Sequence, residues 1–349
     1  MRIAIATTQI PFVSGGAEMQ AQSLRNALMQ RGHQAEVVTI PFKWYPPERI
    51  AESIISARLV DLTEVNGVPI DLLIGLKFPA YFFRHANKVA WIIHQHREAY
   101  DTWGTEFGGL HLYPDGASVR DMIWRADQTY LKECKRLFAE SRRVAQRLDQ
   151  YNGLSAETLY HPCPNSDQLS NQGDEGYFFY PSRMDTSKRQ HLVLEAMALV
   201  DRSVRLVIAG GSGTPAYTKR LHDLVRYHHL EERVKILGSI SEEQKRDLYS
   251  KCRAVIFPPF DEDYGYVTLE AFYSHKPVIT CSDSGGPLEF IQSEKTGLVV
   301  EPDSEELADA LERFDRSKEL ANEMGEEAYR TIVAKNLSWE RIVEELTKE

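Results

Sequence analysis

The sequence predicts two doubly wound α/β domains in tandem, each with a parallel sheet covered by helices on both faces. Apolar runs of strand length alternate with helix-length periodic segments along the whole chain. The pattern starts again after the midpoint, and 349 residues suffice for about two domains. Polar or charged residues interrupt every apolar run before 18 residues, so the sequence contains no candidate membrane span.

Six apolar runs in the first half are bounded by polar or turn residues, and each is a predicted strand. They are residues 3–7, 35–40, 71–76, 89–94, 137–141 and 157–161. A helix is predicted over residues 17–31, because Gly32 can take the left-handed conformation that ends a helix. A second helix is predicted over much of residues 118–135.

The second half repeats the pattern. The predicted strands are residues 177–181, 204–210, 234–238, 254–258, 277–281 and 296–300, and the predicted helices begin near Ser187, Thr214, Ser241, Val267 and Ser304. Residues 161–176 are rich in Pro, Asn, Ser and Gly, which indicates a linker. We therefore expect a first domain over residues 1–165 and a second over residues 166–330.

A C-terminal helical segment, residues 331–349, follows the second domain. Its apolar side chains form one helical stripe: Trp339, Ile342, Val343 and Leu346. Such a stripe must pack on something. The helix could reach either domain, and packing back on the first domain is the expectation.

The charge of the chain disfavours nucleic acid as a partner, because a nucleic-acid binder shows a basic face and a high pI. The net charge is −10 and the pI is about 5.6, and residues 1–165 hold 18 Lys and Arg against 17 Asp and Glu. A basic run in this half is expected to be a solvated helical face, with contact to anionic lipid as the alternative. The run comprises Lys132, Lys135, Arg136, Arg142, Arg143 and Arg147.

The cysteines argue against a zinc site and against a disulfide framework. Cys134, Cys163, Cys252 and Cys281 lie far apart, and no CxxC motif is present. A reducing cytoplasm is therefore the expected compartment.

Two motifs of the first domain lie where strands end, which is the edge at which parallel sheets bind ligands. Gly15 and Gly16 precede the first helix and allow close backbone approach of an anion or a substrate, although a plain turn is an equal alternative. His94 ends a strand, where it could move a proton near neutral pH or play a structural part. His96 shares its strand face, but no third residue completes a metal site.

The second domain opens with a strand that is followed by Arg183 and Lys188. Two cations beside a helix start would bind a diphosphate, whereas a single surface lysine would mean little. Gly210, Gly211 and Gly213 form another glycine-rich turn after the next strand.

The strongest signal is the segment PPFDEDYGYVTLEAF. Glu262 and Glu270 stand eight residues apart, one in a loop and one inside the next helix, so one could contact a sugar and the other a ribose hydroxyl. The helix start between them offers backbone donors to phosphate at Gly265, Tyr266 and Val267. Asp261 and Asp263 could instead hold a divalent cation; we expect no metal, because the Arg/Lys pair already supplies positive charge.

These motifs together resemble the family-4 retaining glycosyltransferases of GT-B fold. The likeness rests on G-G-A before the first helix, the strand-end histidine, S-R-x(4)-K and E-x(7)-E, and it spans essentially the whole chain. It implies two Rossmann-like domains facing a central cleft, with the acceptor on the first domain and a nucleotide-sugar mostly on the second.

The resemblance also implies roles for single residues. Arg183 and Lys188 match the diphosphate-binding pair, Glu262 the glutamate near the transferred sugar, and Glu270 the one on the ribose. His94 matches the histidine near the donor sugar. The remaining matches are the first-loop glycine Gly16 and the backbone contacts to the base at Ser239 and Ile240. Gly15, Gly211 and Tyr264 are further residues that we expect to bind the donor.

Two departures from the family pattern stand out. Asp263 and Tyr264 stand where the family usually has Gly-Phe, which puts the shape around the sugar in doubt. His96 leaves open which strand-end histidine is functional, although His94 fits the end of the strand better.

The resulting hypothesis is a metal-independent retaining hexosyltransferase without a cofactor. It would move a sugar from a nucleotide diphosphate donor, with UDP favoured, to a hydroxyl of a glycan or lipid-linked acceptor in polysaccharide or glycolipid biosynthesis. It would be cytoplasmic, with peripheral contact to the inner membrane as an option. The alternatives are a nucleotide-sugar epimerase or hydrolase and a non-catalytic sugar-nucleotide-binding protein. A dinucleotide dehydrogenase is disfavoured, because neither half has GxGxxG followed by an acid about 20 residues on.

Overall fold

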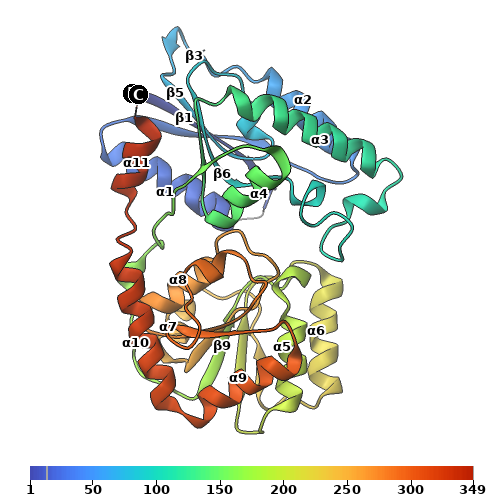
Figure 1. Ribbon diagram of the computed structural model, residues 1–349, viewed down its shortest axis with the longest axis vertical. Helices are drawn as coiled ribbons and strands as arrows, with labels where there is room; N and C mark the ends of the chain where they lie inside the picture. The colour runs from blue at the N-terminus through green and yellow to red at the C-terminus, as the bar shows by residue number, and fades with distance from the viewer. Residues whose placement is uncertain (13–14, 349) are drawn as a thin grey trace. The chain divides into compact units, whose positions relative to one another are not determined.

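The computed structural model describes residues 1–12 and 15–348, and the chain divides into two compact units. Unit 1 comprises Met1–Pro162 together with the C-terminal residues from Leu337, and unit 2 comprises Cys163–Asn336 (Figure 1). Each unit is an α/β domain with its own parallel sheet, so the predicted fold class is confirmed.

The sheet of unit 1 has the order β2-β1-β5-β6-β7-β8, and every neighbouring pair is parallel. Its strands are β1 (Arg2–Gln9), β2 (Gln34–Pro41), β5 (Leu72–Lys77), β6 (Lys88–His94), β7 (Arg136–Ala139) and β8 (Glu157–Thr158). Its helices are α1 (Gly16–Gln30), α2 (Glu48–Leu59), α3 (Gly116–Tyr130), α4 (Arg142–Asn152) and α11 (Trp339–Thr347). A small hairpin, β3 (Glu64–Val65) with β4 (Val68–Pro69), lies outside the main sheet.

Both faces of this sheet are buried, which explains why its strands are nearly continuous apolar runs. In β6, Val89, Trp91 and Ile93 belong to a core shared with α1 and α11. The residues between them, Ala90 and Ile92, belong to a core shared with α2, α3 and α4. The helices accordingly flank the sheet on its two sides (Figure 1).

The C-terminal helix α11 packs within unit 1. Its stripe residues Ile342, Val343 and Leu346 are buried in the same core as α1. Arg136 of β7 donates hydrogen bonds to the carbonyls at the end of this helix, with a distance of 2.6 Å to Glu345 O. The chain therefore returns to its first domain after unit 2 is complete.

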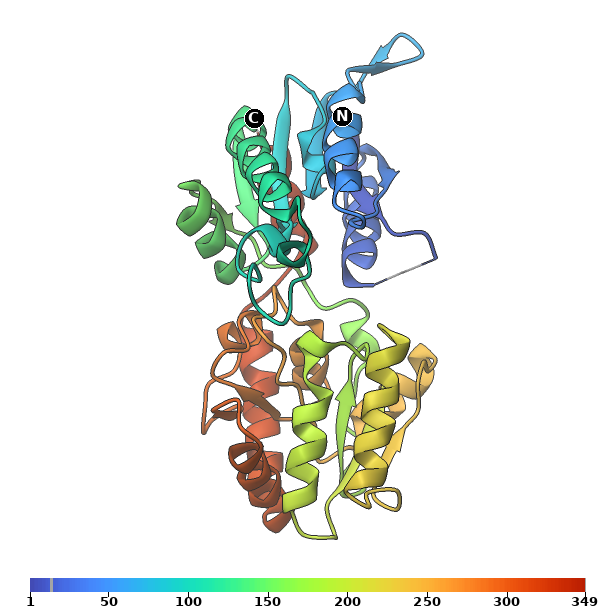
Figure 2. The same ribbon diagram turned by 90° about the vertical axis from the view of Figure 1, so that its right-hand side faces the viewer.

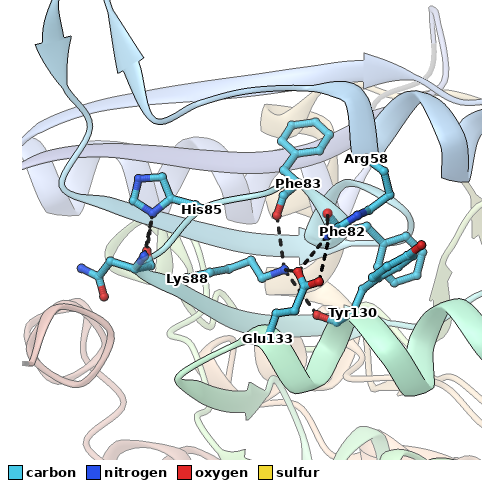
Figure 3. Close-up of polar contacts among 8 residues, drawn as sticks. Arg58, Phe82, Phe83, His85, Lys88, Tyr130 and Glu133 are labelled. Atoms are coloured by element: carbon cyan, nitrogen blue, oxygen red, sulfur yellow. Dashed lines mark hydrogen bonds and ion pairs between the residues drawn. The ribbon is translucent and has the colours of Figure 1, made fainter.

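An ion cluster around a buried lysine lies at the start of β6, at the edge opposite His94 (Figure 3). Lys88 is fully buried, and its Nζ donates to Phe83 O at 3.2 Å, Tyr130 O at 3.3 Å and Glu133 Oε2 at 3.1 Å. Arg58 of α2 donates to the same carboxylate at 2.7 Å. Burial raises the pKa of Glu133, but the two cations outweigh it and hold that pKa below its usual value.

The sheet of unit 2 has the order β11-β10-β9-β12-β13-β14 and is also parallel throughout. Its strands are β9 (Tyr177–Pro181), β10 (Arg205–Ala209), β11 (Val234–Ile236), β12 (Ala254–Ile256), β13 (Val278–Cys281) and β14 (Gly297–Val300). Its helices are α5 (Gln190–Leu199), α6 (Pro215–Tyr227), α7 (Glu242–Lys251), α8 (Tyr266–Tyr273), α9 (Ser304–Arg316) and α10 (Lys318–Ala334). Helices α5 and α6 lie side by side on this sheet (Figure 2).

The basic run does not form the single solvated helical face that its sequence suggests, and this prediction is wrong. Its residues fall on a short 3-10 turn, on the bend before β7, on β7 itself and on α4. Arg147 is 5% exposed, with its guanidinium 3.6 Å from the carboxylate of Asp101, and Arg136 binds the end of α11. Arg147 and Arg136 instead contact residues that are distant in sequence, and the local sequence pattern does not reveal such contacts.

Along residues 1–12 and 15–348, no helix combines the length and the apolar character that a membrane crossing requires.

Candidate functional site

The predicted diphosphate and sugar residues of unit 2 lie at the point where its strand order changes direction. From the neighbouring pair β9 and β12, strands β10 and β11 extend the sheet to one side and strands β13 and β14 to the other. In open parallel sheets, ligands bind at this switch point, beyond the carboxyl ends of the strands. Arg183 and Lys188 follow β9, and Glu262 follows β12. The two loops are joined by a hydrogen bond from Phe260 N to Ser187 O at 2.7 Å.

Lys188 and Glu262 are in direct contact. Lys188 ends a 3-10 turn that Asp185 caps, because Asp185 Oδ1 accepts a hydrogen bond from Ser187 N at 3.0 Å. From this position, Lys188 Nζ donates to Glu262 Oε2, and the two side chains are only 16% and 23% exposed. The carbonyl of Lys188 accepts a hydrogen bond from the buried Tyr180 hydroxyl, which fixes the backbone.

Arg183 is more open than Lys188. Its side chain is 57% exposed and lies 3.9 Å from the Asp185 carboxylate of the same loop. Its carbonyl accepts a hydrogen bond from Gln190 Nε2 at 2.9 Å. The backbone at Arg183 is therefore anchored, while its guanidinium is accessible to an anion from solvent.

Glycines allow the loops at this edge to approach each other. A Cβ at Gly210 would lie 2.0 Å from Ser182 O, and one at Gly285 would lie 2.6 Å from Glu262 O. Gly285 also has a φ of +69°, which favours glycine. Gly211 lies beside Ser239, since its Cβ would be 3.2 Å from that hydroxyl oxygen. The glycine turn after β10 thus adjoins both the Arg183 loop and the predicted base-binding loop.

The segment that follows Glu262 forms the start of α8. Gly265 has a φ of +90° and precedes the helix, whose first residues are Tyr266 and Val267. Tyr264 is only 3% exposed, and its ring packs against Phe290 at 5.5 Å between centroids. The ring of Tyr264 therefore stays in the interior of unit 2.

Glu270 of α8 lies against α7. Lys245 Nζ donates to its Oε1 at 2.9 Å, and the Tyr249 hydroxyl donates to its Oε2 at 2.7 Å. Ser239 and Ile240 lie in the loop that leads into α7, which Ser241 caps. A cavity of about 550 Å³ adjoins Ile240, and its walls include Gln168, Ser170, Gln172, Gln244 and Asp247.

Arg189, which the sequence analysis did not single out, helps to hold the loop that carries Glu262. It has a φ of +60°, and its guanidinium binds Asp283 with two hydrogen bonds of 2.7 and 2.6 Å. Although burial lowers the pKa of Arg189, its bonds to Asp283 raise it above the usual value. Asp283 O in turn accepts from Asp261 N at 2.9 Å, so the pair anchors the loop that carries Glu262. The partners stand 94 residues apart, so only the spatial order of the strands brings them together.

In unit 1, the two histidines lie in different surroundings. His94 ends β6, is half-buried, and has its Nδ1 2.7 Å from Gln95 O. His96 is buried against Phe42 and Phe78, with ring centroids 6.1 and 5.4 Å away. Burial, with a smaller effect of His94, lowers the pKa of His96 to about 3. His96 is therefore neutral near pH 7, and His94 is the better candidate for a functional histidine.

Gln95, between the two histidines, belongs to a buried network that the sequence analysis also missed. Its Nε2 donates to Asp127 at 2.7 Å and to Asn152 at 2.9 Å. Asp127 accepts two further hydrogen bonds, from the hydroxyls of Tyr100 at 2.6 Å and Tyr81 at 3.0 Å. Burial raises the pKa of Asp127 to about 6, although these three donors oppose the shift. The network ties the end of β6 to α3 and α4.

The glycine turn of unit 1 is described in part, because Val13 and Ser14 lie outside the described residues. Gly15 precedes α1, and its N–H donates to Glu18 Oε2 at 2.8 Å. Gly16 is the first residue of the helix. The Glu18 carboxylate thus occupies one of the backbone donors of this helix start.

Comparison with known proteins defines the class. Over the full length, the fold matches the crystal structure of Anabaena Alr3699/HepE in complex with UDP and glucose, with a TM-score of 0.73 at 17% identity and 100% of both chains covered. It also matches sucrose-phosphate synthase from Thermosynechococcus elongatus, with a TM-score of 0.77 at 20% identity, covering 99% of this chain and 97% of the other. The chain therefore has the GT-B fold of glycosyltransferases.

The sequence comparisons narrow this class. Residues 164–331 match the model of the family described as glycosyl transferases group 1. The α-1,3/1,6-mannosyltransferase ALG2 of Homo sapiens is 33% identical over 60% of this chain and 54% of its own length. The O-antigen chain mannosyltransferase RfbU of Salmonella typhimurium is 26% identical over 58% of this chain and 60% of its own length. The chain spans about half the length of the curated relatives it matches.

Proposed function

We propose that the protein is a retaining hexosyltransferase that uses a nucleotide diphosphate sugar. The acceptor would be a hydroxyl of a glycan or of a lipid-linked glycan. The observation that carries the proposal is the contact of Lys188 with Glu262 at the switch point of unit 2, beside the accessible guanidinium of Arg183. Cations and a carboxylate at one strand edge suit a charged diphosphate joined to a polar sugar.

In this proposal, the residues of unit 2 bind the donor. Lys188 and Arg183 stabilise the negative charge that grows on the departing diphosphate, without a metal ion. Glu262 contacts the transferred sugar and Glu270 the ribose. Ser239 and Ile240 contact the base through their backbone, and the start of α8 donates to phosphate.

The residues of unit 1 serve the acceptor side and the donor sugar. His94 contacts the sugar, and the helix start at Gly15 and Gly16 receives part of the ligand. No carboxylate is assigned as a covalent nucleophile. We therefore propose a front-face displacement, in which the bond to the sugar breaks and forms on the same face. The leaving diphosphate takes the proton of the acceptor hydroxyl, and retention of configuration follows.

The sugar and the base are open to a direct test. The curated relatives named above are mannosyltransferases, whereas the Anabaena structure is a complex with UDP and glucose. We favour a UDP-sugar, and GDP-mannose is the donor to compare with it. An epimerase or a hydrolase of the same fold would bind the same donor but would not need an acceptor.

A donor panel tests the function. The full chain is incubated with UDP-glucose, UDP-N-acetylglucosamine, UDP-galactose and GDP-mannose, with and without glycan and glycolipid extracts, and the released nucleoside diphosphate is measured. A transferase is expected to release nucleoside diphosphate from one of the donors, and to do so much faster when an extract supplies an acceptor. Equal release without an acceptor would indicate a hydrolase, a changed sugar without release would indicate an epimerase, and binding alone would indicate a non-catalytic protein.

A further inference from the structure

The carboxylate of Glu270 is held on both oxygens by helix α7. Lys245 donates to Oε1 and Tyr249 to Oε2, and these two residues stand four apart on one face of the helix. A carboxylate can accept about four hydrogen bonds. The Glu270 side chain is 12% exposed, so part of it is open to a ligand. The remaining lone pairs suit the two neighbouring hydroxyls of a ribose.

The hydroxyl of Tyr249 is held in place to donate to this carboxylate. Tyr249 is fully buried, and its ring meets Phe179 edge to face with 5.1 Å between centroids. Burial first, and then the charge of Glu270, raise the pKa of Tyr249 well above its usual value. Its hydroxyl therefore stays protonated and donates at any physiological pH. The ammonium of Lys245, in contrast, is shared between Glu270 and Glu242, which lies 2.9 Å away.

We propose that Tyr249 is a positioning residue that orients Glu270 for recognition of the nucleotide ribose. The inference rests on the proposed function, which places a nucleotide donor at this edge of unit 2. Without the Tyr249 hydroxyl, the carboxylate can rotate toward Lys245 and no longer presents both oxygens to the ribose. Tyr249 thereby sets the preference of the site for ribonucleotides over deoxyribonucleotides.

The test is Tyr249→Phe, which keeps the buried ring and removes the hydroxyl. Dissociation constants of UDP and 2′-deoxy-UDP are measured on the full chain by calorimetry, with GDP and 2′-deoxy-GDP as a parallel pair. We expect the wild type to prefer the ribonucleotide and Tyr249→Phe to lose about tenfold of that preference, the order of one hydrogen bond to a charged group. Glu270→Gln should lose the preference too, and adding Tyr249→Phe to it should cause no further loss.

Tyr177→Phe is the matched control. Tyr177 is also buried, and its hydroxyl donates to α7 at Leu248 O, 2.9 Å away, without contact to Glu270. Its removal costs one buried hydrogen bond and should leave the ribose preference unchanged. Lys245→Met provides a second variant at the surface side of the carboxylate, and we expect it to weaken the preference in the same sense.

The outcomes separate the two levels of the proposal. If Tyr249→Phe lowers the melting temperature but keeps the wild-type preference, Tyr249 only joins two helices and the inference is wrong. If Tyr249→Phe does not fold, Tyr249→Met, which also removes the hydroxyl, takes its place, and an unchanged preference in that variant has the same meaning. A wild type that binds UDP and 2′-deoxy-UDP equally would also overturn the inference on Tyr249, but it would leave the proposed binding of a nucleotide donor standing. A wild type that binds no nucleoside diphosphate would overturn the proposed function itself.

Discussion

Lys188 and Glu262 form an ion pair across 74 residues of sequence, from the loop after β9 to the loop after β12. Before a donor binds, the Lys188 ammonium and the Glu262 carboxylate are therefore hydrogen-bond partners of each other. A donor that places its diphosphate near Lys188 and its sugar near Glu262 must exchange this pair for two separate contacts. The ion pair keeps both side chains at the switch point, and each charge neutralises the other until a donor binds.

Glu262→Gln should separate the sugar role from the diphosphate role. The amide keeps the size of the side chain but removes the charge, which releases Lys188 for phosphate. We expect turnover to fall by about a hundredfold, the order seen when one transition-state contact is lost. The dissociation constant of the nucleoside diphosphate should stay the same or decrease. Steady-state kinetics and calorimetry measure the two quantities, and a large loss of nucleoside diphosphate affinity would show that Glu262 is misassigned.

Glu133→Gln should destabilise unit 1, because it leaves the fully buried ammonium of Lys88 without its carboxylate (Figure 3). A buried polar group that loses its partner costs about 1–3 kcal/mol. All five tryptophans, Trp44, Trp91, Trp103, Trp124 and Trp339, belong to unit 1, so tryptophan fluorescence during urea unfolding follows this unit. Glu52→Gln, in an exposed pair with Arg49 of the same unit, is the control and should change nothing measurable.

The same variant gives a pH test. The folded pKa of Glu133 lies below its ordinary value of 4.5, so the ionised carboxylate stabilises the folded state above that pH. The contribution is lost as the pH falls through the lower, folded pKa. The difference in unfolding free energy between the wild type and Glu133→Gln should therefore be constant from pH 6 to 7 and shrink below pH 4.5. A difference that grows on acidification would contradict the assignment.

The strands were predictable because they are buried on both faces. In β6, every residue from Val89 to Ile93 packs into one core or the other, so the whole run must be apolar. Helix α2 was not predicted, although Ile50, Ile54 and Ala57 recur at helical spacing. The terminal stripe was found, but only the three-dimensional structure places it beside α1.

The site was predictable where the chemistry follows a local motif and not where it depends on partners. Strand ends and the E-x(7)-E spacing drew attention to Lys188, Glu262 and Glu270. The groups that hold them in place, Arg189 with Asp283 and Tyr249 with Glu270, come from separate strands and helices. Their pairing is set by the order of strands in the sheet, which no local spacing encodes.

Metal independence follows from the cations that the proposal assigns to the diphosphate. With Lys188 and Arg183 supplying positive charge, transfer should continue in excess EDTA and gain little from Mg²⁺ or Mn²⁺. The assay is the rate of nucleoside diphosphate release after dialysis against the chelator. Complete loss of activity that Mn²⁺ restores would assign the acidic run from Asp261 to Asp263 to a metal ion instead.

Lys188→Ala should have the largest effect of any single change in unit 2. The Lys188 ammonium is mostly buried, and a charge-assisted hydrogen bond contributes about 1.5–3 kcal/mol. The charge of the leaving diphosphate grows in the transition state, so the loss should be larger for turnover than for ground-state binding. We expect turnover to fall by about a hundredfold or more. Binding of the nucleoside diphosphate should weaken, and binding of the bare nucleoside should not change.

Two companion variants make this result specific. Arg183→Lys keeps the charge but loses the two-pronged guanidinium, so an intermediate defect is expected. Lys219→Ala removes an exposed lysine of α6 that pairs with Asp223, and it should leave turnover unchanged. The rates of all three variants are compared with the donor that the panel identifies. If Lys188→Ala turned over as fast as Lys219→Ala, Lys188 would be an ordinary surface cation, and the diphosphate would have to bind elsewhere.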